Sequence, residues 1–172
     1  LDETHTLSAG PGGCTRRDGL EPDIVTVGKP LASGLAAAAY GFSAEVAARV
    51  AAEIRSDESD TGGIGGTLAG NALVLAAMRA TLQEVLTDEA YARMFALAER
   101  FEAGVEAAVA EAGLPWIVQR LGARVEYWFR DTPPANGGEA AASIDPALDR
   151  YMHLAALNRG ILMTPFHNMA LM

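Results

Sequence analysis

Residues 24–34, Ile24-Val25-Thr26-Val27-Gly28-Lys29-Pro30-Leu31-Ala32-Ser33-Gly34, decide how the fold of this sequence is interpreted. The β-branched run at 24–27 predicts a short buried strand. Pro30 lacks a backbone N–H and disfavours helical geometry in the residue before it, so we expect the strand to end at Gly28 and Lys29 to be extended. Lys29 would then stand at the carboxyl end of a strand, where open α/β sheets bind ligands.

Lys29 is the only lysine in the chain, and the other twelve basic residues are arginines. Arginine keeps its proton at physiological pH and cannot act as an amine nucleophile, whereas a lysine in a desolvating pocket can. The alternative is a lone surface lysine in an arginine-rich protein. Position alone does not separate these two interpretations.

A second candidate group lies at the start of the chain. Residues 1–5, Leu1-Asp2-Glu3-Thr4-His5, are typical of the end of another buried strand. Asp2 and Lys29 could then lie at the same edge of one sheet, on neighbouring strands. A carboxylate and an amine so placed suit pyridoxal phosphate. The amine forms a Schiff base, and the carboxylate keeps the pyridine nitrogen protonated, so that the ring acts as an electron sink.

Three motifs occur in order along the chain: Asp2-Glu3-Thr4-His5-Thr6, then residues 22–34 from Pro22 to Gly34, then Gly66-Thr67-Leu68-Ala69-Gly70-Asn71. Together they resemble the class III aminotransferases, and most closely the glutamate-1-semialdehyde aminomutase-like branch. The resemblance runs over nearly the whole chain. It implies an α/β fold of the fold type I class, with part of a large, mainly parallel sheet domain and a small α+β carboxyl-terminal domain.

The resemblance also implies a role for each matching residue. Lys29 would be the Schiff-base lysine, Asp2 would pair with the pyridine nitrogen, and Thr67 would bind the cofactor phosphate of the neighbouring subunit of a homodimer. His5 stands where the family often has a polar partner for the cofactor's phenolic oxygen. Thr4 departs from the pattern, because the family usually has an aliphatic residue there, on the face of the ring.

The order of elements predicts three parts: residues 1–86 as the end of the cofactor-binding domain, 87–115 as a linking helix, and 116–172 as the small domain. In the first part we expect a loop with a turn or two over 6–23, a buried strand over 36–42, a helix over 44–54 capped by Ser43, and a helix over 72–86 capped by Asn71. Leu73, Ala76, Ala77, Ala80 and Leu82 are expected to be largely buried.

A polar break at 55–60 leads into a glycine-rich segment at 61–67. Such glycines can form a phosphate cradle, but the segment lacks the Gly-Lys-Ser/Thr ending of a P-loop. Thr67 on a loop that reaches a partner's cofactor is the interpretation we favour.

Thr87 is predicted to cap a helix that runs to about Ala112, with apolar residues on one face. Two strands, 116–120 and 123–129, should meet at a turn at Gly122. An exposed loop at 131–138, a helix from Pro146 to Arg159 and a last strand at 161–164 follow. The closing run 164–169 lies where the family places residues near the substrate.

Arg124 is the candidate substrate-binding residue, because an arginine on a strand that faces the cleft can hold a carboxylate with two hydrogen bonds. A strand has two faces, so an outward, solvated Arg124 remains the alternative.

Charge, cysteine content and histidine spacing argue against several other classes of protein. The net charge of −9 argues against a nucleic acid or an anionic membrane as partner. A single cysteine, Cys14, favours a reducing compartment, and with no signal peptide or membrane-length apolar run we expect a cytoplasmic protein. The three histidines lack metal-ligand spacing, so no metal site is predicted.

We therefore expect an enzyme acting on a small-molecule amino donor and keto acceptor, as the carboxyl-terminal portion of a longer chain that is inactive in isolation. Two alternatives stay open: another fold type I pyridoxal enzyme, such as a decarboxylase or racemase, or a non-catalytic piece that serves only in assembly.

Overall fold

The computed structural model describes residues 1–54, 65–165 and 168–172. The chain divides into two compact units, Leu1–Tyr91 and Ala92–Met172, each of which is described by itself. The division falls within a long helix, α4 (Asp88–Glu111). That helix occupies most of the predicted linking segment, and the domain boundaries at 86 and 115 remain predictions.

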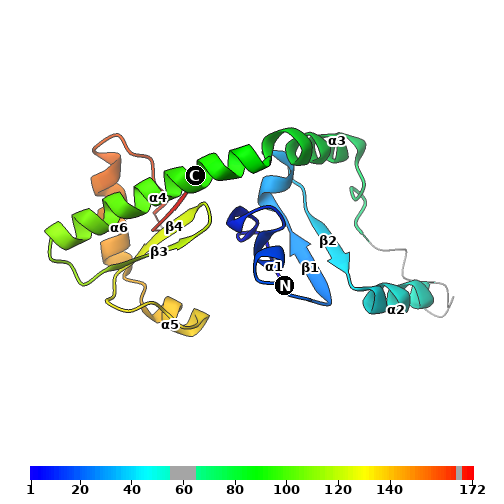
Figure 1. The fold of residues 1–172 in the computed structure, drawn as a ribbon, viewed down its shortest axis with the longest axis horizontal. Coiled ribbons are helices and arrows are strands. Elements are labelled where there is room, and N and C mark those ends of the chain that lie inside the picture. Colours follow the sequence, from blue (N-terminus) through cyan, green and yellow to red (C-terminus); the bar gives the residue numbers. More distant parts are fainter. Residues whose placement is uncertain (55–64, 166–167) are drawn as a thin grey trace. The chain divides into compact units, whose positions relative to one another are not determined.

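In the first unit the strands are β1 (Ile24–Val27) and β2 (Ala39–Phe42), and the helices are η1 (Leu7–Ala9), α1 (Gly13–Arg17), η2 (Lys29–Ala32), α2 (Ala44–Ile54), α3 (Ala72–Ala80) and η3 (Thr81–Val85) (Figure 1). The second unit contains most of α4, then β3 (Ile117–Leu121), β4 (Arg124–Trp128), α5 (Gly137–Ala142), α6 (Pro146–Leu157) and β5 (Met169–Leu171).

The sheet of the first unit pairs β1 with β2 antiparallel, from Ile24 opposite Phe42 to Val27 opposite Ala39. Asp2 forms an isolated parallel bridge with Thr26 on the other edge of β1. In the described residues, this bridge is the only parallel pairing, so the mainly parallel sheet implied by the family resemblance is not seen within them. The strand predicted over 36–42 starts later, at Ala39.

The burial predicted for these strands is wrong. Ile24 is 42% exposed and Tyr40 is 50% exposed. The β-branched and aromatic composition of the strands was a correct indication of an extended backbone, but nothing in the described part of the chain covers these side chains. The burial expected for five residues after Asn71 is also wrong. Leu73 is 68% and Leu82 is 51% exposed, Ala76 and Ala80 are exposed, and Ala77 is half-buried.

The loop predicted over 6–23, with a turn or two, agrees with the structure, in which the turns are the short helices η1 and α1. Gly12 and Gly13 have φ angles of +86° and +63°, in the left-handed region that glycine adopts without strain. These two glycines allow the backbone to turn sharply into α1.

Helix capping follows the sequence closely. The predicted caps Ser43, Asn71, Thr87 and Asp145 each accept a hydrogen bond from a backbone N–H in the first turn of their helix. The helix after Asn71 ends as an α-helix at Ala80 and continues as one π-helical stretch, η3, which the sequence pattern did not predict.

The sheet of the second unit has the order β3-β4-β5, with antiparallel pairs throughout. The predicted β3–β4 hairpin is confirmed, and Gly122 at its turn has a φ of +60°. The last strand was placed wrongly: β5 is Met169–Leu171, not 161–164. The carbonyl oxygen of Met163 lies 2.6 Å from His153 Nδ1 and so faces helix α6, not a neighbouring strand.

Two further differences concern this unit. α5 begins at Gly137, inside the predicted exposed loop, and is capped by Asn136. α6 ends at Leu157, two residues before the predicted end. Phe166 and His167, in the run that we expected near the substrate, lie outside the described residues.

The core of the second unit lies between α4 and one face of the sheet. Ala98 of α4 and Val125 of β4 are fully buried, as is Ala123 in the hairpin. Arg120, on the same face, forms ion pairs with Glu102 (2.6 Å) and Glu99 (3.4 Å) of α4. Because side chains alternate along β4, the side chain of Arg124 lies on the opposite face. No helix among the described residues is long and apolar enough to span a bilayer.

Candidate functional site

Asp2 and Lys29 are brought together by pairing of the chain start with β1. The Glu3 amide donates to the Thr26 carbonyl (2.7 Å), and the Thr26 amide donates to the Leu1 carbonyl (2.9 Å). Thr26 lies three residues before Lys29. Asp2 and Lys29 therefore lie on adjacent segments, as expected from the sequence. The buried strand expected at the start of the chain is wrong, because Asp2 forms only an isolated bridge and Leu1 is 50% exposed.

Asp2 is exposed and strongly acidic in this setting. Hydrogen bonds from the side chain and the amide of Thr4 lower the pKa of its carboxyl group, and the positive charges of Lys29 and His5 act in the same direction. The Thr4 amide lies 2.8 Å from Asp2 Oδ1. Asp2 is thus a carboxylate over the whole neutral range, as a partner for a protonated ring nitrogen must be.

Lys29 is not extended as predicted. Its φ is +48°, in the left-handed region, and it begins η2. Leu31 and Ala32, the next residues of this turn, are only 3% and 2% exposed. We attribute the unusual backbone to the burial of these two side chains, which outweighs the local preference of a residue before proline.

The turn that carries Lys29 is also tied to the helical part of the unit. Ser33 has a φ of +47°, and its hydroxyl lies 2.9 Å from the Thr81 hydroxyl. Thr81 is the first residue of the π-helical stretch and is 3% exposed. A non-glycine residue with positive φ carries strain, and two of them around one functional candidate indicate a geometry that the surrounding structure enforces.

His5 Nε2 lies 2.7 Å from Lys29 Nζ. The sequence placed His5 near the cofactor's phenolic oxygen, by family resemblance, and gave no reason to expect a contact with the amine itself. Sequence spacing could not have shown it, because 24 residues separate the two.

Thr4 lies beside the strand end. Its Oγ1 would be 3.7 Å from a β-carbon built on Gly28, which is buried. Thr4 therefore contacts the segment between β1 and Lys29, and its role at the ring face remains a prediction.

Thr67 lies in an exposed turn ahead of α3, in which the Ala69 amide donates to the Gly66 carbonyl (2.9 Å). The preceding residues 55–64, which include the polar break and most of the glycine-rich segment, lie outside the described residues. The assignment of Thr67 to a neighbouring subunit's phosphate is untested by this geometry.

Arg124 belongs to the other unit, so its position relative to Lys29 is not defined. It forms an ion pair with Glu126 at 3.0 Å and lines a cavity of about 300 Å³ on the sheet face opposite α4. Whether this face lines a substrate cleft, as the candidate role of Arg124 requires, stays a prediction. To hold a substrate carboxylate, Arg124 would have to exchange Glu126 for it.

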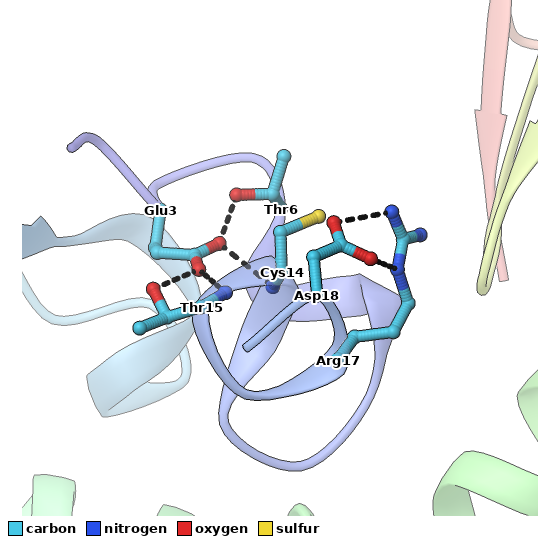
Figure 2. Close-up of polar contacts among 6 residues, drawn as sticks. All are labelled: Glu3, Thr6, Cys14, Thr15, Arg17 and Asp18. Carbon is cyan, nitrogen blue, oxygen red and sulfur yellow. Dashed lines mark hydrogen bonds and ion pairs between the residues drawn. The ribbon is translucent and has the colours of Figure 1, made fainter. Parts of the chain in front are cut away.

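Sequence reasoning missed Glu3. Its carboxylate accepts hydrogen bonds from the Thr6 and Thr15 hydroxyls and from the Cys14 and Thr15 amides, as Figure 2 shows. The side chain is 2% exposed. A single buried acid produces no periodic pattern in the sequence. The only signal was the group of glycines in the following loop, which lets another side chain come close to the backbone.

Cys14, whose amide is one of these donors, is partly buried, and burial raises the pKa of its thiol. It is therefore a poor nucleophile. Within the described residues no cluster of histidine, cysteine, aspartate and glutamate could hold a metal ion.

The chain is similar to known proteins over nearly its whole length. The family model for class III aminotransferases matches residues 2–172. A glutamate-1-semialdehyde 2,1-aminomutase from Thermus thermophilus is 37% identical over 156 residues, which are 90% of this chain and 35% of that protein.

Among solved structures, a glutamate-1-semialdehyde aminomutase from Pseudomonas aeruginosa PAO1 in complex with PMP is 50% identical, with a TM-score of 0.92 over 99% of this chain and 39% of that one. A β-phenylalanine aminotransferase from Variovorax paradoxus, at 24% identity, shares the fold with a TM-score of 0.82 over 99% and 38%. The chain thus spans little more than a third of the length of these proteins. It belongs to the class III aminotransferase family.

Proposed function

We propose that the complete protein is a pyridoxal-phosphate-dependent aminotransferase or aminomutase that acts on an amino acid or amino ketone through a Schiff base at Lys29. The observation that carries the proposal is the pairing of Asp2 with Thr26 on β1, which brings a charged carboxylate to the strand edge that leads into Lys29. Known proteins similar in sequence are named as aminomutases, and the solved relative at 50% identity holds PMP, the amino form of this cofactor.

The residues present fit the cofactor. Lys29 supplies the amine that would hold it covalently, and Asp2 supplies an anion whose lowered pKa suits a pyridinium nitrogen. His5 supplies a ring nitrogen for the phenolic oxygen. When bound, pyridoxal phosphate supplies an electron sink that stabilises negative charge on the substrate α-carbon.

In this assignment each group of the chain has one task. Asp2 holds a proton on the pyridine nitrogen. Lys29, once its nitrogen is free, is the basic group that can take and return a proton at the substrate carbon. The remaining proposals are that Thr67 contacts the phosphate of the neighbouring subunit in a homodimer, that Arg124 binds a substrate carboxylate, and that the protein is cytoplasmic.

A decarboxylase or racemase on the same scaffold is the alternative, because Asp2 and Lys29 would serve those reactions equally. The two classes separate in a substrate screen that follows amino transfer and carbon dioxide release in parallel. Amino transfer or amino migration without release of carbon dioxide supports the proposal.

The direct test is to reduce the complete, cofactor-loaded protein with borohydride and map the modified peptide. We expect the adduct on Lys29 alone. Lys29→Arg should give no adduct and no turnover while the protein still folds, since arginine keeps the positive charge but cannot act as an amine nucleophile. An adduct on another residue, or none in the wild-type protein, contradicts the assignment.

A further inference from the structure

Glu3 is a buried acid in a place where burial should make it neutral. Desolvation raises the pKa of its carboxyl group, but the hydrogen bonds from Thr15, Thr6 and the Cys14 amide outweigh this effect, and the net pKa is lowered. Glu3 is therefore an anion held by neutral donors, since the guanidinium of Arg17 is bound to Asp18 instead (2.8 Å) (Figure 2).

All of these donors come from one segment, residues 6–15. The Thr15 hydroxyl lies 2.6 Å from Glu3 Oε1 and the Cys14 amide lies 3.2 Å from Oε2. The Thr6 hydroxyl and the Thr15 amide complete the set. A single carboxylate thus joins the start of η1 to the start of α1, and charge-assisted hydrogen bonds of this kind are stronger than neutral ones.

The backbone of the same residue joins this segment to the strand. The Glu3 amide donates to the Thr26 carbonyl (2.7 Å), and the Glu3 carbonyl accepts from the amides of Thr6 (3.2 Å) and Leu7 (2.9 Å). The turn closed by these bonds contains His5. Glu3 therefore connects β1 to the turn that presents an imidazole to Lys29.

Gly13 shows how closely the segment fits the acid. A β-carbon at this position would lie 2.6 Å from Glu3 Oε2, closer than carbon and oxygen atoms can approach. Its φ of +63° also favours glycine. The Glu3 carboxylate therefore lies directly against the backbone of Gly13, where any larger residue would displace it.

We propose that Glu3 is a positioning residue: its carboxylate locks residues 4–15 so that His5 stays within hydrogen-bonding distance of Lys29. The functional importance of that contact rests on the proposed function, whereas the locking of the segment does not.

The test uses the complete enzyme with Glu3→Gln, which keeps the size of the side chain but removes its charge and turns an NH₂ group toward backbone donors. The first readout is the rate of tryptic cleavage after Arg16 and Arg17 in the cofactor-free protein. We expect faster cleavage in Glu3→Gln, because the segment is no longer held. Glu21→Gln, which makes the same change at an exposed glutamate that is not adjacent to either scissile bond, is the matched control and should change little.

The second readout is a double-mutant cycle with His5→Gln, in which the rate of cofactor attachment to the cofactor-free protein is followed by absorbance. Glu3→Gln should slow attachment roughly tenfold or more, since a displacement of about 1 Å is costly. In the His5→Gln background the same change should add little, because Glu3 acts through His5.

Unchanged cleavage in Glu3→Gln, or effects that add fully in the cycle, overturns the proposal and leaves Glu3 as a contributor to stability alone. If Glu3→Gln fails to fold, Thr15→Val removes one donor and keeps the acid, and the same two measurements are made on it. Borohydride trapping of Lys29 is independent of both readouts, so failure of the proposed function is recognised separately.

Discussion

His5 Nε2 and Lys29 Nζ lie 2.7 Å apart. The two residues are separated by 24 positions in the sequence, and the pairing of the chain start with β1 brings them together. Asp2 belongs to the same group of residues, because Lys29 and His5 both help to lower the pKa of its carboxyl group.

The first prediction concerns this contact. His5→Phe keeps an aromatic ring but removes both nitrogens, so the Lys29 amine loses its nearest partner and attachment of the cofactor should slow by roughly tenfold or more. Absorbance after mixing the cofactor-free protein with pyridoxal phosphate measures the rate. His153→Phe, at a histidine of the other unit that contacts the Met163 carbonyl, serves as the control. Equal rates for His5→Phe and wild type would exclude a role for the contact.

The second prediction concerns Asp2. Asp2→Asn should slow proton abstraction at the substrate α-carbon much more than it weakens cofactor binding, because the amide cannot hold a positive charge on the pyridine nitrogen. Each tenfold loss of rate corresponds to about 1.4 kcal/mol of barrier. Single-turnover measurements at saturating cofactor isolate this step. An unchanged single-turnover rate would assign Asp2 a different task.

The third prediction uses the backbone of Lys29. At a φ of +48° a β-carbon is unfavourable, by about 1–2 kcal/mol in the left-handed region. In the middle of a helix or strand, glycine is usually less stabilising than alanine, by roughly 0.5–1 kcal/mol. We therefore expect the cofactor-free Lys29→Gly variant to be at least as stable as Lys29→Ala in urea unfolding. If Lys29→Ala is clearly more stable to urea than Lys29→Gly, residue 29 adopts a negative φ in solution.

Much of the local structure was predictable because it depends on neighbouring residues. Ser43, Asn71, Thr87 and Asp145 cap helices where the sequence placed the caps, since a cap needs only its own side chain and the next few amides. Gly122 formed the predicted hairpin turn for the same reason.

The site was predictable only in part, because tertiary contacts decide the rest. The sequence led us to expect Asp2 and Lys29 on neighbouring segments, and the bridge between Asp2 and Thr26 places them so. The positive φ of Lys29, in contrast, accompanies the burial of Leu31 and Ala32, which no local rule before a proline includes. Glu3 was missed because its partners lie up to 12 residues away and are all neutral.

The fourth prediction is a dependence of stability on pH through Glu3. The pKa of Glu3 is lowered in the folded state from an ordinary value of 4.5. Its contribution is therefore fully present above about pH 4.5 and is lost as the pH falls through the lower, folded value. Tm of wild type and Glu3→Gln should be compared from about pH 7 to about pH 3. The difference in Tm between wild type and Glu3→Gln should become smaller as the pH falls toward about 3. A Tm difference that does not depend on pH would mean that the charge of Glu3 does not contribute to stability.

The last prediction concerns Tyr127 in the second unit. Tyr127 is 8% exposed, and its ring contacts the Trp116 ring, stacked at 5.9 Å, and the Phe129 ring, tilted at 5.9 Å. The Trp116 and Phe129 rings also contact each other, at 4.7 Å. The Tyr127 hydroxyl is buried and has no hydrogen-bond partner among the described residues. A buried polar group without a partner costs about 1–3 kcal/mol, so Tyr127→Phe should keep the stacking and lose nothing in stability at neutral pH.

The difference in stability between Tyr127→Phe and wild type should grow at alkaline pH. Burial, with a smaller effect of Asp149, raises the pKa of Tyr127 from 10.0 to about 12. Between these values the unfolded chain loses the phenolic proton and the folded protein keeps it, so the wild-type protein loses stability as the pH rises, by about 2–3 kcal/mol over the whole range. Tyr127→Phe lacks this loss, and its Tm should exceed that of wild type increasingly above pH 10. Tyr151→Phe, at a tyrosine that is 66% exposed, should follow wild type at every pH. Parallel curves for Tyr127→Phe and wild type would show that the Tyr127 hydroxyl reaches solvent or a partner in the complete enzyme.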